Sequence, residues 1–166
     1  ASAPVSGSAT APDSRAARPR IVILGDSLSA GYGLNDGESY PARLQERIDA
    51  AGLAFEVANV SVSGDTSAGG LRRLEWALDG DVRVVVLELG ANDGLRGLPV
   101  DALRENLARM IERAQARGAQ VVLAGMEAPP NFGPAYTRDF HRVYPELAAR
   151  YRVADRKSTR LNSSHT

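Results

Sequence analysis

Short apolar runs alternate along the chain with longer stretches in which apolar residues recur every third or fourth position. A short run rich in β-branched side chains predicts a buried strand, and strict alternation predicts a half-buried one. By these patterns we expect four strands, at residues 21–24, 55–60, 82–89 and 120–124, and the start of a fifth at 151–154.

The stretches between these runs carry the helical period, which predicts amphipathic helices. End signals support the assignment, since Pro99 and Asp101 suit the first turn of a helix and Gly118 suits its end. On the second helix we expect Trp76 to lie against the sheet edge or a neighbouring element. The predicted helices span residues 39–51, 68–78, 99–118 and 136–150.

Strands that alternate with helices predict an α/β fold with a three-layer, doubly wound parallel sheet. In such a sheet the ligand lies beyond the carboxyl ends of the strands, near the switch in strand order. Polar, glycine-containing loops follow the first three strands at residues 25–27, 63–65 and 90–93. We therefore expect these three loops to meet at one edge of the sheet.

Composition divides the 166 residues into three segments. Residues 1–19 are rich in Ala, Ser, Pro and Gly without periodicity, which is typical of a flexible leader. Residues 20–154 form the single predicted domain. Residues 155–166 differ in composition, include the only lysine, Lys157, and look like a translated sequencing adapter. We expect the final strand and helix of the natural fold to be largely missing, which would expose apolar sheet and helix surface.

Charge and cysteine content exclude several kinds of function. The chain has 20 basic and 20 acidic residues, so its net charge gives no reason to expect nucleic acid or an anionic membrane as partner. Without cysteine there is no disulfide, thiolate nucleophile or cysteine metal site. Two histidines and no dense carboxylate cluster argue against a metal enzyme, and no apolar run approaches membrane-spanning length.

The three converging loops each contain a residue suited to nucleophilic catalysis. Ser27 would present a hydroxyl and a backbone N–H, Gly64 a second N–H, and Asn92 a carboxamide N–H. Each has a simpler explanation when taken alone: a phosphate-binding or capping serine, a turn glycine, and an asparagine at a helix start. Their order, each behind a strand, favours a serine nucleophile with an oxyanion hole.

A family resemblance is carried by GDSLS at residues 25–29, VSGDT at 62–66 and GANDGLRG at 90–97. These resemble the first three sequence blocks of the GDSL or SGNH hydrolases. The third block and PPNFG at 129–133 are similar to the bacterial branch of thioesterase I, lysophospholipase L1 and arylesterases.

The resemblance implies a flavodoxin-like SGNH fold with Ser27 as nucleophile and Ser27, Gly64 and Asn92 as the oxyanion hole. Residues 90–96 would line the acyl pocket. It further implies hydrolysis of small carboxylic esters or acyl thioesters through an acyl-Ser27 intermediate. No cofactor would be needed, and the enzyme would act as a monomer in the periplasm or outside the cell.

One family feature has no match in this chain. The family carries a catalytic histidine in an Asp-x-x-His block near the C-terminus. His141 falls in the middle of a predicted helix, and His165 follows Asn162 rather than an aspartate, within the adapter-like tail. We assign neither a catalytic role and expect a nearly inactive chain from a gene for an active enzyme.

Two alternatives stay open at this point. A carbohydrate acetylesterase of the same family would differ in its acyl-chain selectivity. A non-catalytic, flavodoxin-like binding or receiver module would share the strand order, but only Asp26 fits a phosphoacceptor and the domain lacks the required lysine.

Overall fold

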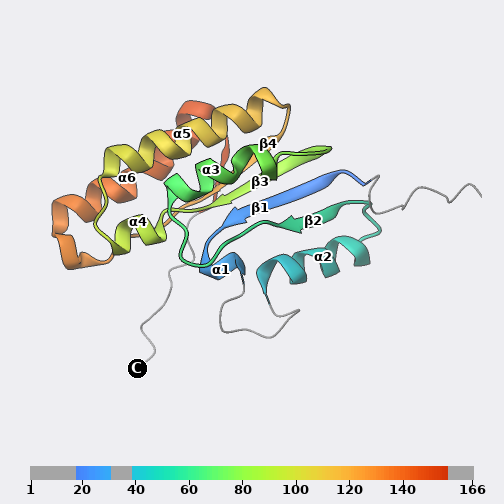
Figure 1. Ribbon diagram of the computed structural model, residues 1–166, viewed down its shortest axis with the longest axis horizontal. Helices are drawn as coiled ribbons and strands as arrows, with labels where there is room; N and C mark the ends of the chain where they lie inside the picture. The colour runs from blue at the N-terminus through green and yellow to red at the C-terminus, as the bar shows by residue number, and fades with distance from the viewer. Residues whose placement is uncertain (1–17, 31–38, 157–166) are drawn as a thin grey trace, which may run out of the picture.

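The structure is a computed structural model that describes residues 18–30 and 39–156, except the side chains of Ser27 and Leu28. Most of the predicted leader, the glycine-rich loop at 31–38 and residues 157–166 lie outside the described residues. Within these limits the chain forms one parallel sheet with helices on its two faces (Figure 1).

Five strands are present near the predicted positions, and all pair in parallel. The fifth begins at Ala154 rather than at Tyr151, because α6 continues through Tyr151. The order across the sheet is β2-β1-β3-β4-β5, so the switch in strand order lies between β1 and β3. This confirms the predicted α/β fold. The strands are β1 (Arg20–Gly25), β2 (Glu56–Asn59), β3 (Val82–Glu88), β4 (Gln120–Ala124) and β5 (Ala154–Arg156).

The long helices are divided unequally between the two faces. In Figure 1, α2 lies on one side of the sheet, and α3, α5 and α6 lie together on the other. This division follows from the right-handed crossover rule, by which the direction of a connection across the sheet sets the face that its helix covers. The connection from β1 to β2 runs toward the β2 edge, whereas the connections that contain α3, α5 and α6 run toward the β5 edge. The four helices are α2 (Tyr40–Ala50), α3 (Ser67–Ala77), α5 (Val100–Ala116) and α6 (Pro134–Tyr151).

The main core lies between the sheet and the three-helix face. Alternate residues of the strands point to it, so Val85 and Leu87 of β3 are fully buried. They pack with fully buried residues of the helices such as Leu74, Leu107 and Phe140. On the opposite face of β3, Val84 is only half-buried. No helix in the described part of the chain is long and apolar enough to cross a membrane.

Two short helices replace what the sequence predicts as loops. These are α1 (Ser27–Ala30), close after β1, and α4 (Ala91–Leu95), close after β3, and each is about one turn long. A 3-10 turn, η1 (Pro130–Phe132), lies in the predicted loop before α6. Their sequences carry too few periodic apolar positions to be read as helices, because a single turn buries little surface of its own.

The prediction for Trp76 is wrong. Its side chain is 70% exposed, although it stands in the middle of a well-formed helix. The buried positions of α3, which include Gly70, Leu74 and Ala77, recur at helical spacing and leave Trp76 on the solvent side. A large aromatic residue indicates burial only when the period of its helix also points it inward.

The fifth strand extends beyond the predicted domain boundary. Asp155 and Arg156, which the composition assigns to the tail, pair with Leu123 and Ala124 of β4. The N–H of Gly125 also donates to the carbonyl oxygen of Arg156 at 2.8 Å. Pairing of this kind uses backbone groups, so it does not depend on the natural or foreign origin of the side chains.

Candidate active site

The candidate residues lie at the carboxyl ends of β1, β2 and β3. Figure 1 shows α1, the segment between β2 and α3, and α4 gathered at this end of the sheet. Ser27 begins α1, immediately after Asp26, which is buried and whose carbonyl oxygen accepts from the N–H of Ala30 at 2.9 Å. The Ser27 side chain is outside the described part, so its role as nucleophile stays a prediction.

Gly64 is brought to the same edge by backbone pairing beyond β2. The N–H of Val62 donates to the carbonyl oxygen of Gly25 at 3.1 Å, which holds the segment beside the end of β1. A turn then closes where the N–H of Asp65 donates to the carbonyl of Val62 at 3.2 Å, with Gly64 at φ +82°. No hydrogen bond among the described residues uses the Gly64 N–H. That N–H is therefore available to a ligand oxygen.

Asn92 lies in α4 with its side chain directed at this turn. Its Nδ2 donates to the carbonyl oxygen of Asp65 at 2.9 Å, and Nη2 of Arg96 donates to the carbonyl oxygen of Gly64 at 3.2 Å. A carboxamide nitrogen carries two hydrogens, so one remains for a ligand after the bond to Asp65. The structure thus brings together Gly64 and Asn92, which are 28 positions apart by residue number.

The turn that carries Gly64 is also fixed to α3. The Asp65 carboxylate accepts from Nε and Nη2 of Arg73 at 2.8 and 2.6 Å, and Arg73 also donates to the carbonyl of Val60. Both side chains are largely buried, which makes the ion pair less screened than one on the surface. Sequence analysis assigned no role to Arg73, because a salt bridge eight residues apart leaves no periodic signal.

Glu88 is a second residue that the sequence analysis missed. It ends β3 beneath α1, and its Oε2 accepts from the Ser29 hydroxyl at 2.6 Å. The carbonyl oxygen of Ser29 in turn accepts from Nδ2 of Asn59 at 2.8 Å. Burial raises the pKa of the Glu88 carboxyl, the Ser29 hydrogen bond opposes the rise, and the charge of Asp26 adds to it. The sequence signal that could have identified Glu88 is an acidic residue at the end of the apolar strand β3.

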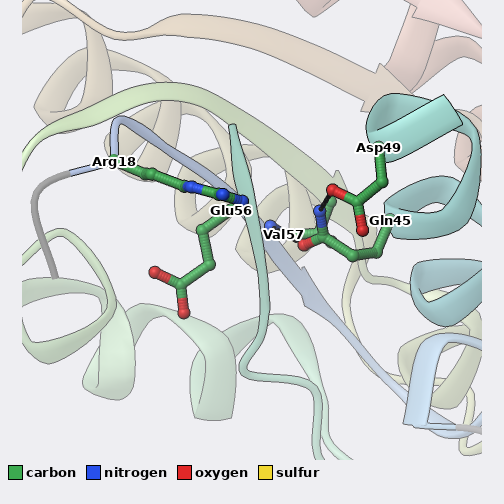
Figure 2. A pocket seen from close by; sticks show the side chains of 5 residues that line it. All are labelled: Arg18, Gln45, Asp49, Glu56 and Val57. Carbon is green, nitrogen blue, oxygen red and sulfur yellow. Dashed lines mark hydrogen bonds between the residues drawn. The ribbon is translucent and has the colours of Figure 1, made fainter. Parts of the chain in front are cut away.

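Two hollows lie among the described residues without contact to the predicted oxyanion donors. One, of about 550 Å³, is lined by residues of the segment before α6 and of α6 itself: Glu127, Pro130, Pro134, Thr137, Arg138 and His141. The other, of about 210 Å³, lies at the starting end of β2, where Figure 2 shows Gln45 and Asp49 of α2 beside Glu56 and Val57. Neither is lined by Gly64 or Asn92.

His141 is exposed on α6, as expected, and His165 lies outside the described residues. No hydrogen bond of the described residues joins His141 to α1, the Gly64 turn or α4. Within residues 18–30 and 39–156, no group of three or more His, Cys, Asp or Glu residues could hold a metal ion.

The strand order and this edge define a class: a flavodoxin-like α/β protein whose ligand site is built from the loops after its strands. The chain belongs to the GDSL-like Lipase/Acylhydrolase family, whose model matches residues 23–159. This confirms the resemblance found in the motifs. By this membership the chain is a carboxylic ester hydrolase.

Named relatives support the same assignment. The chain is 46% identical over 141 residues to Esterase TesA of Pseudomonas aeruginosa, covering 84% of this chain and 70% of TesA. It is 38% identical over 139 residues to Thioesterase 1/protease 1/lysophospholipase L1 of Escherichia coli K12, covering 83% of this chain and 65% of that protein. The crystal structure of AlinE4, an SGNH-hydrolase family esterase, superposes with a TM-score of 0.78 at 43% identity, covering 83% of this chain and 75% of AlinE4.

Proposed function

We propose that this chain hydrolyses carboxylic esters and acyl thioesters through an acyl intermediate on Ser27. The observation that carries the assignment is the 2.9 Å bond from Asn92 Nδ2 to the Asp65 carbonyl. It holds a side-chain amide beside the Gly64 turn, at the end of the sheet where Ser27 begins α1. Esterase and thioesterase names among relatives at 38–46% identity agree with this substrate class.

In the proposed reaction the Ser27 hydroxyl oxygen attacks the carbonyl carbon and loses its proton to a base. The carbonyl π electrons move to oxygen, which becomes an oxyanion in reach of the N–H groups of Ser27, Gly64 and Asn92. When the oxyanion collapses, the alcohol or thiol leaves with a proton and acyl-Ser27 remains. Water then attacks the acyl group in the same way, which releases the acid and restores the Ser27 hydroxyl.

The described residues include no group that we can assign as the base that accepts the Ser27 proton. His141 makes no hydrogen bond to this edge within the described part of the chain, and its helix position puts it beside the hollow near Glu127. Removing a base from a serine triad costs orders of magnitude in turnover, although oxyanion donors and binding leave residual catalysis. We therefore expect the 166-residue chain to act slowly and to be assisted by an added base.

The first test is hydrolysis of p-nitrophenyl acetate, butyrate and octanoate by the chain and by Ser27→Ala, with and without imidazole. We expect imidazole to increase a Ser27-dependent rate, because it can accept the hydroxyl proton. Imidazole also reacts directly with the ester, and the rate measured with Ser27→Ala gives this background for subtraction. Asn92→Ala should reduce the Ser27-dependent kcat by about 10²–10³-fold through loss of one oxyanion donor.

Ser39→Ala is the matched control. Ser39 precedes α2, but its side chain makes no cap hydrogen bond, so its loss should leave the rates unchanged. Equal rates for the parent chain and Ser27→Ala at every imidazole concentration would overturn the nucleophile assignment. Rates with a coenzyme A thioester, measured beside the esters, decide between the two acyl classes.

The proposed site of action is the periplasm or the exterior, and the proposed state is a monomer. The Ala-, Ser-, Pro- and Gly-rich composition of residues 1–19 supports the location. Cell fractionation of the source organism tests it, since recovery with the cytosol would contradict export. Light scattering across concentrations tests the monomer, and a mass of twice 17.6 kDa would contradict it.

A further inference from the structure

A buried polar cluster joins three helices directly behind the predicted oxyanion donors. Asp93 of α4 is 3% exposed, and Ser67, the first residue of α3, is fully buried. The Asp93 carboxylate accepts from the Ser67 hydroxyl at 2.6 Å and, through its other oxygen, from the Ser67 N–H at 2.8 Å. Nδ2 of Asn106 on α5 donates to the Ser67 hydroxyl oxygen at 3.1 Å. Each of the three side chains therefore makes at least one hydrogen bond within the cluster.

The cluster connects the two chain segments that carry the donors. Asp93 directly follows Asn92, and Ser67 comes three residues after Gly64. A second link, from Asn92 Nδ2 to the Asp65 carbonyl, joins the same segments nearer the site. Two separate hydrogen-bonded links between short segments leave little freedom for one segment to shift against the other.

The bond from Asp93 does more than cap α3. Thr66 already occupies the cap position, where its hydroxyl oxygen accepts from the N–H of Gly69 at 3.3 Å. A carboxylate that is buried loses its hydration, so its burial is tolerated only where donors replace the water. Asp93 accepts from the Ser67 N–H, one of the helix-start donors that Thr66 leaves without an acceptor, and so joins α4 to the start of α3.

The backbone of Asp93 is fixed as well. Its carbonyl oxygen accepts from the N–H of Leu98 at 3.0 Å. The Tyr136 hydroxyl of α6 lies 3.4 Å from the same oxygen and donates more closely to the Leu98 carbonyl, at 2.6 Å. Asp93 is thereby held at its carboxylate by α3 and at its carbonyl by the end of its own loop, which Tyr136 joins to α6. Because Asn92 directly precedes Asp93 in the chain, these bonds also restrict the position of the Asn92 backbone.

We propose that Asp93, together with Ser67 and Asn106, is a positioning unit that sets the separation of the Gly64 N–H and the Asn92 carboxamide. The inference rests on the proposed function, since it assigns a purpose to the spacing of two oxyanion donors. Misplacing a reacting or stabilising group by about 1 Å can cost about 10²-fold in rate. Disruption should therefore lower kcat and leave KM nearly unchanged, because the donors act mainly on the transition state.

The test compares Ser67→Ala, Asn106→Ala and Asp93→Asn with Glu75→Gln. Glu75 lies in the same α3–α5 interface, where it pairs with Arg113 at 3.2 Å and Arg117 at 2.8 Å, away from the donors. For each variant we would measure kcat and KM on p-nitrophenyl butyrate with imidazole, the NMR signals of the Asn92 side-chain amide, and the unfolding midpoint. Ser67→Ala and Asn106→Ala are included because Asp93→Asn can fail to fold.

We expect Ser67→Ala and Asn106→Ala to lower kcat by about 10–100-fold with KM within about twofold, and to shift the Asn92 amide signals. Glu75→Gln should leave both readouts unchanged. If kcat falls in proportion to stability in all variants, including Glu75→Gln, the cluster is only structural and the proposal fails. If Ser27 proves not to be the nucleophile, the NMR readout still decides: unmoved Asn92 signals in Ser67→Ala and Asn106→Ala overturn the positioning role, and moved signals retain it.

Discussion

Glu88, beside the candidate site, makes the free energy of unfolding depend on pH. Burial raises the pKa of its carboxyl in the folded protein, so the folded state binds this proton more tightly than the unfolded chain does. The contribution of Glu88 to the free energy of unfolding is therefore greatest below the unfolded-state pKa, about 4.3, and is lost as pH rises through the folded-state pKa.

Replacing Glu88 with Gln removes this proton and keeps an oxygen that can accept from Ser29. We expect the variant to gain stability relative to the parent chain as pH rises from about 4 to about 8. Urea unfolding of both proteins across this range measures the difference, and the other carboxyl groups cancel in the comparison. A difference that stays constant with pH would show that Glu88 has the same pKa in both states.

Gly90 shows why a residue before the site has to lack a side chain. Its φ is +121°, and a Cβ built there would lie 1.9 Å from the Tyr144 hydroxyl oxygen. Burial raises the pKa of that hydroxyl well above its usual value, so it stays protonated and donates to the Leu89 carbonyl at 2.8 Å. The first residue of the GANDGLRG segment is thus set by a contact with α6.

At the scale of the element, α6 and η1 support α4 with a ladder of rings. Phe132, Tyr136, Phe140 and Tyr144 follow one another at intervals of four residues, with successive centroids 5.5, 6.2 and 5.9 Å apart. Such tilted pairs contribute beyond their buried area. The ladder runs from an exposed ring, Phe132, to fully or nearly fully buried rings at Phe140 and Tyr144.

Phe140→Ala and Phe132→Ala form a matched pair on this ladder. Phe140 is fully buried, so its loss should lower the free energy of unfolding by about 3–5 kcal/mol. Phe132 is 47% exposed, and its truncation should cost about 1 kcal/mol or less. Denaturant unfolding of both variants measures the costs, and similar values would show that the ladder, rather than burial, dominates.

Across the whole molecule, the two faces of the sheet differ in how well they are covered. In Figure 1 the long helices α3, α5 and α6 lie on one face of the sheet, and α2 lies on the other. Leu87 belongs to the core on the three-helix face, and Val84 points to the opposite face. Burial on the α2 face varies along β3, since Val84 is half-buried and Val86 is 8% exposed, whereas Val85 and Leu87 on the other face are fully buried.

Leu87→Ala and Val84→Ala measure this asymmetry. The first should destabilise the fold by about 2–5 kcal/mol, because it opens a cavity in a packed core. The second removes less surface at a half-buried site and should cost about 1 kcal/mol. Equal costs, measured by urea unfolding, would contradict the difference in burial between these two positions.

The sequence by itself determined the strands, the long helices and the edge at which the candidate residues meet. Those features follow from local rules: periodicity sets each element, and parallel strands bring their carboxyl ends to one side. Ser27, Gly64 and Asn92 were selected by the same rules together with the motifs around them, and their catalytic roles stay predictions.

Only the tertiary structure decided which side chains bond to one another. Asn92 with Asp65, Ser67 with Asp93, and Ser29 with Glu88 are joined across 27, 26 and 59 residues. The choice of such partners depends on how helices and strands pack, and a pattern within one element carries no record of its neighbours. Trp76 was misplaced for a different reason: the helical period of α3 already puts it on the solvent side, and its size alone suggested burial.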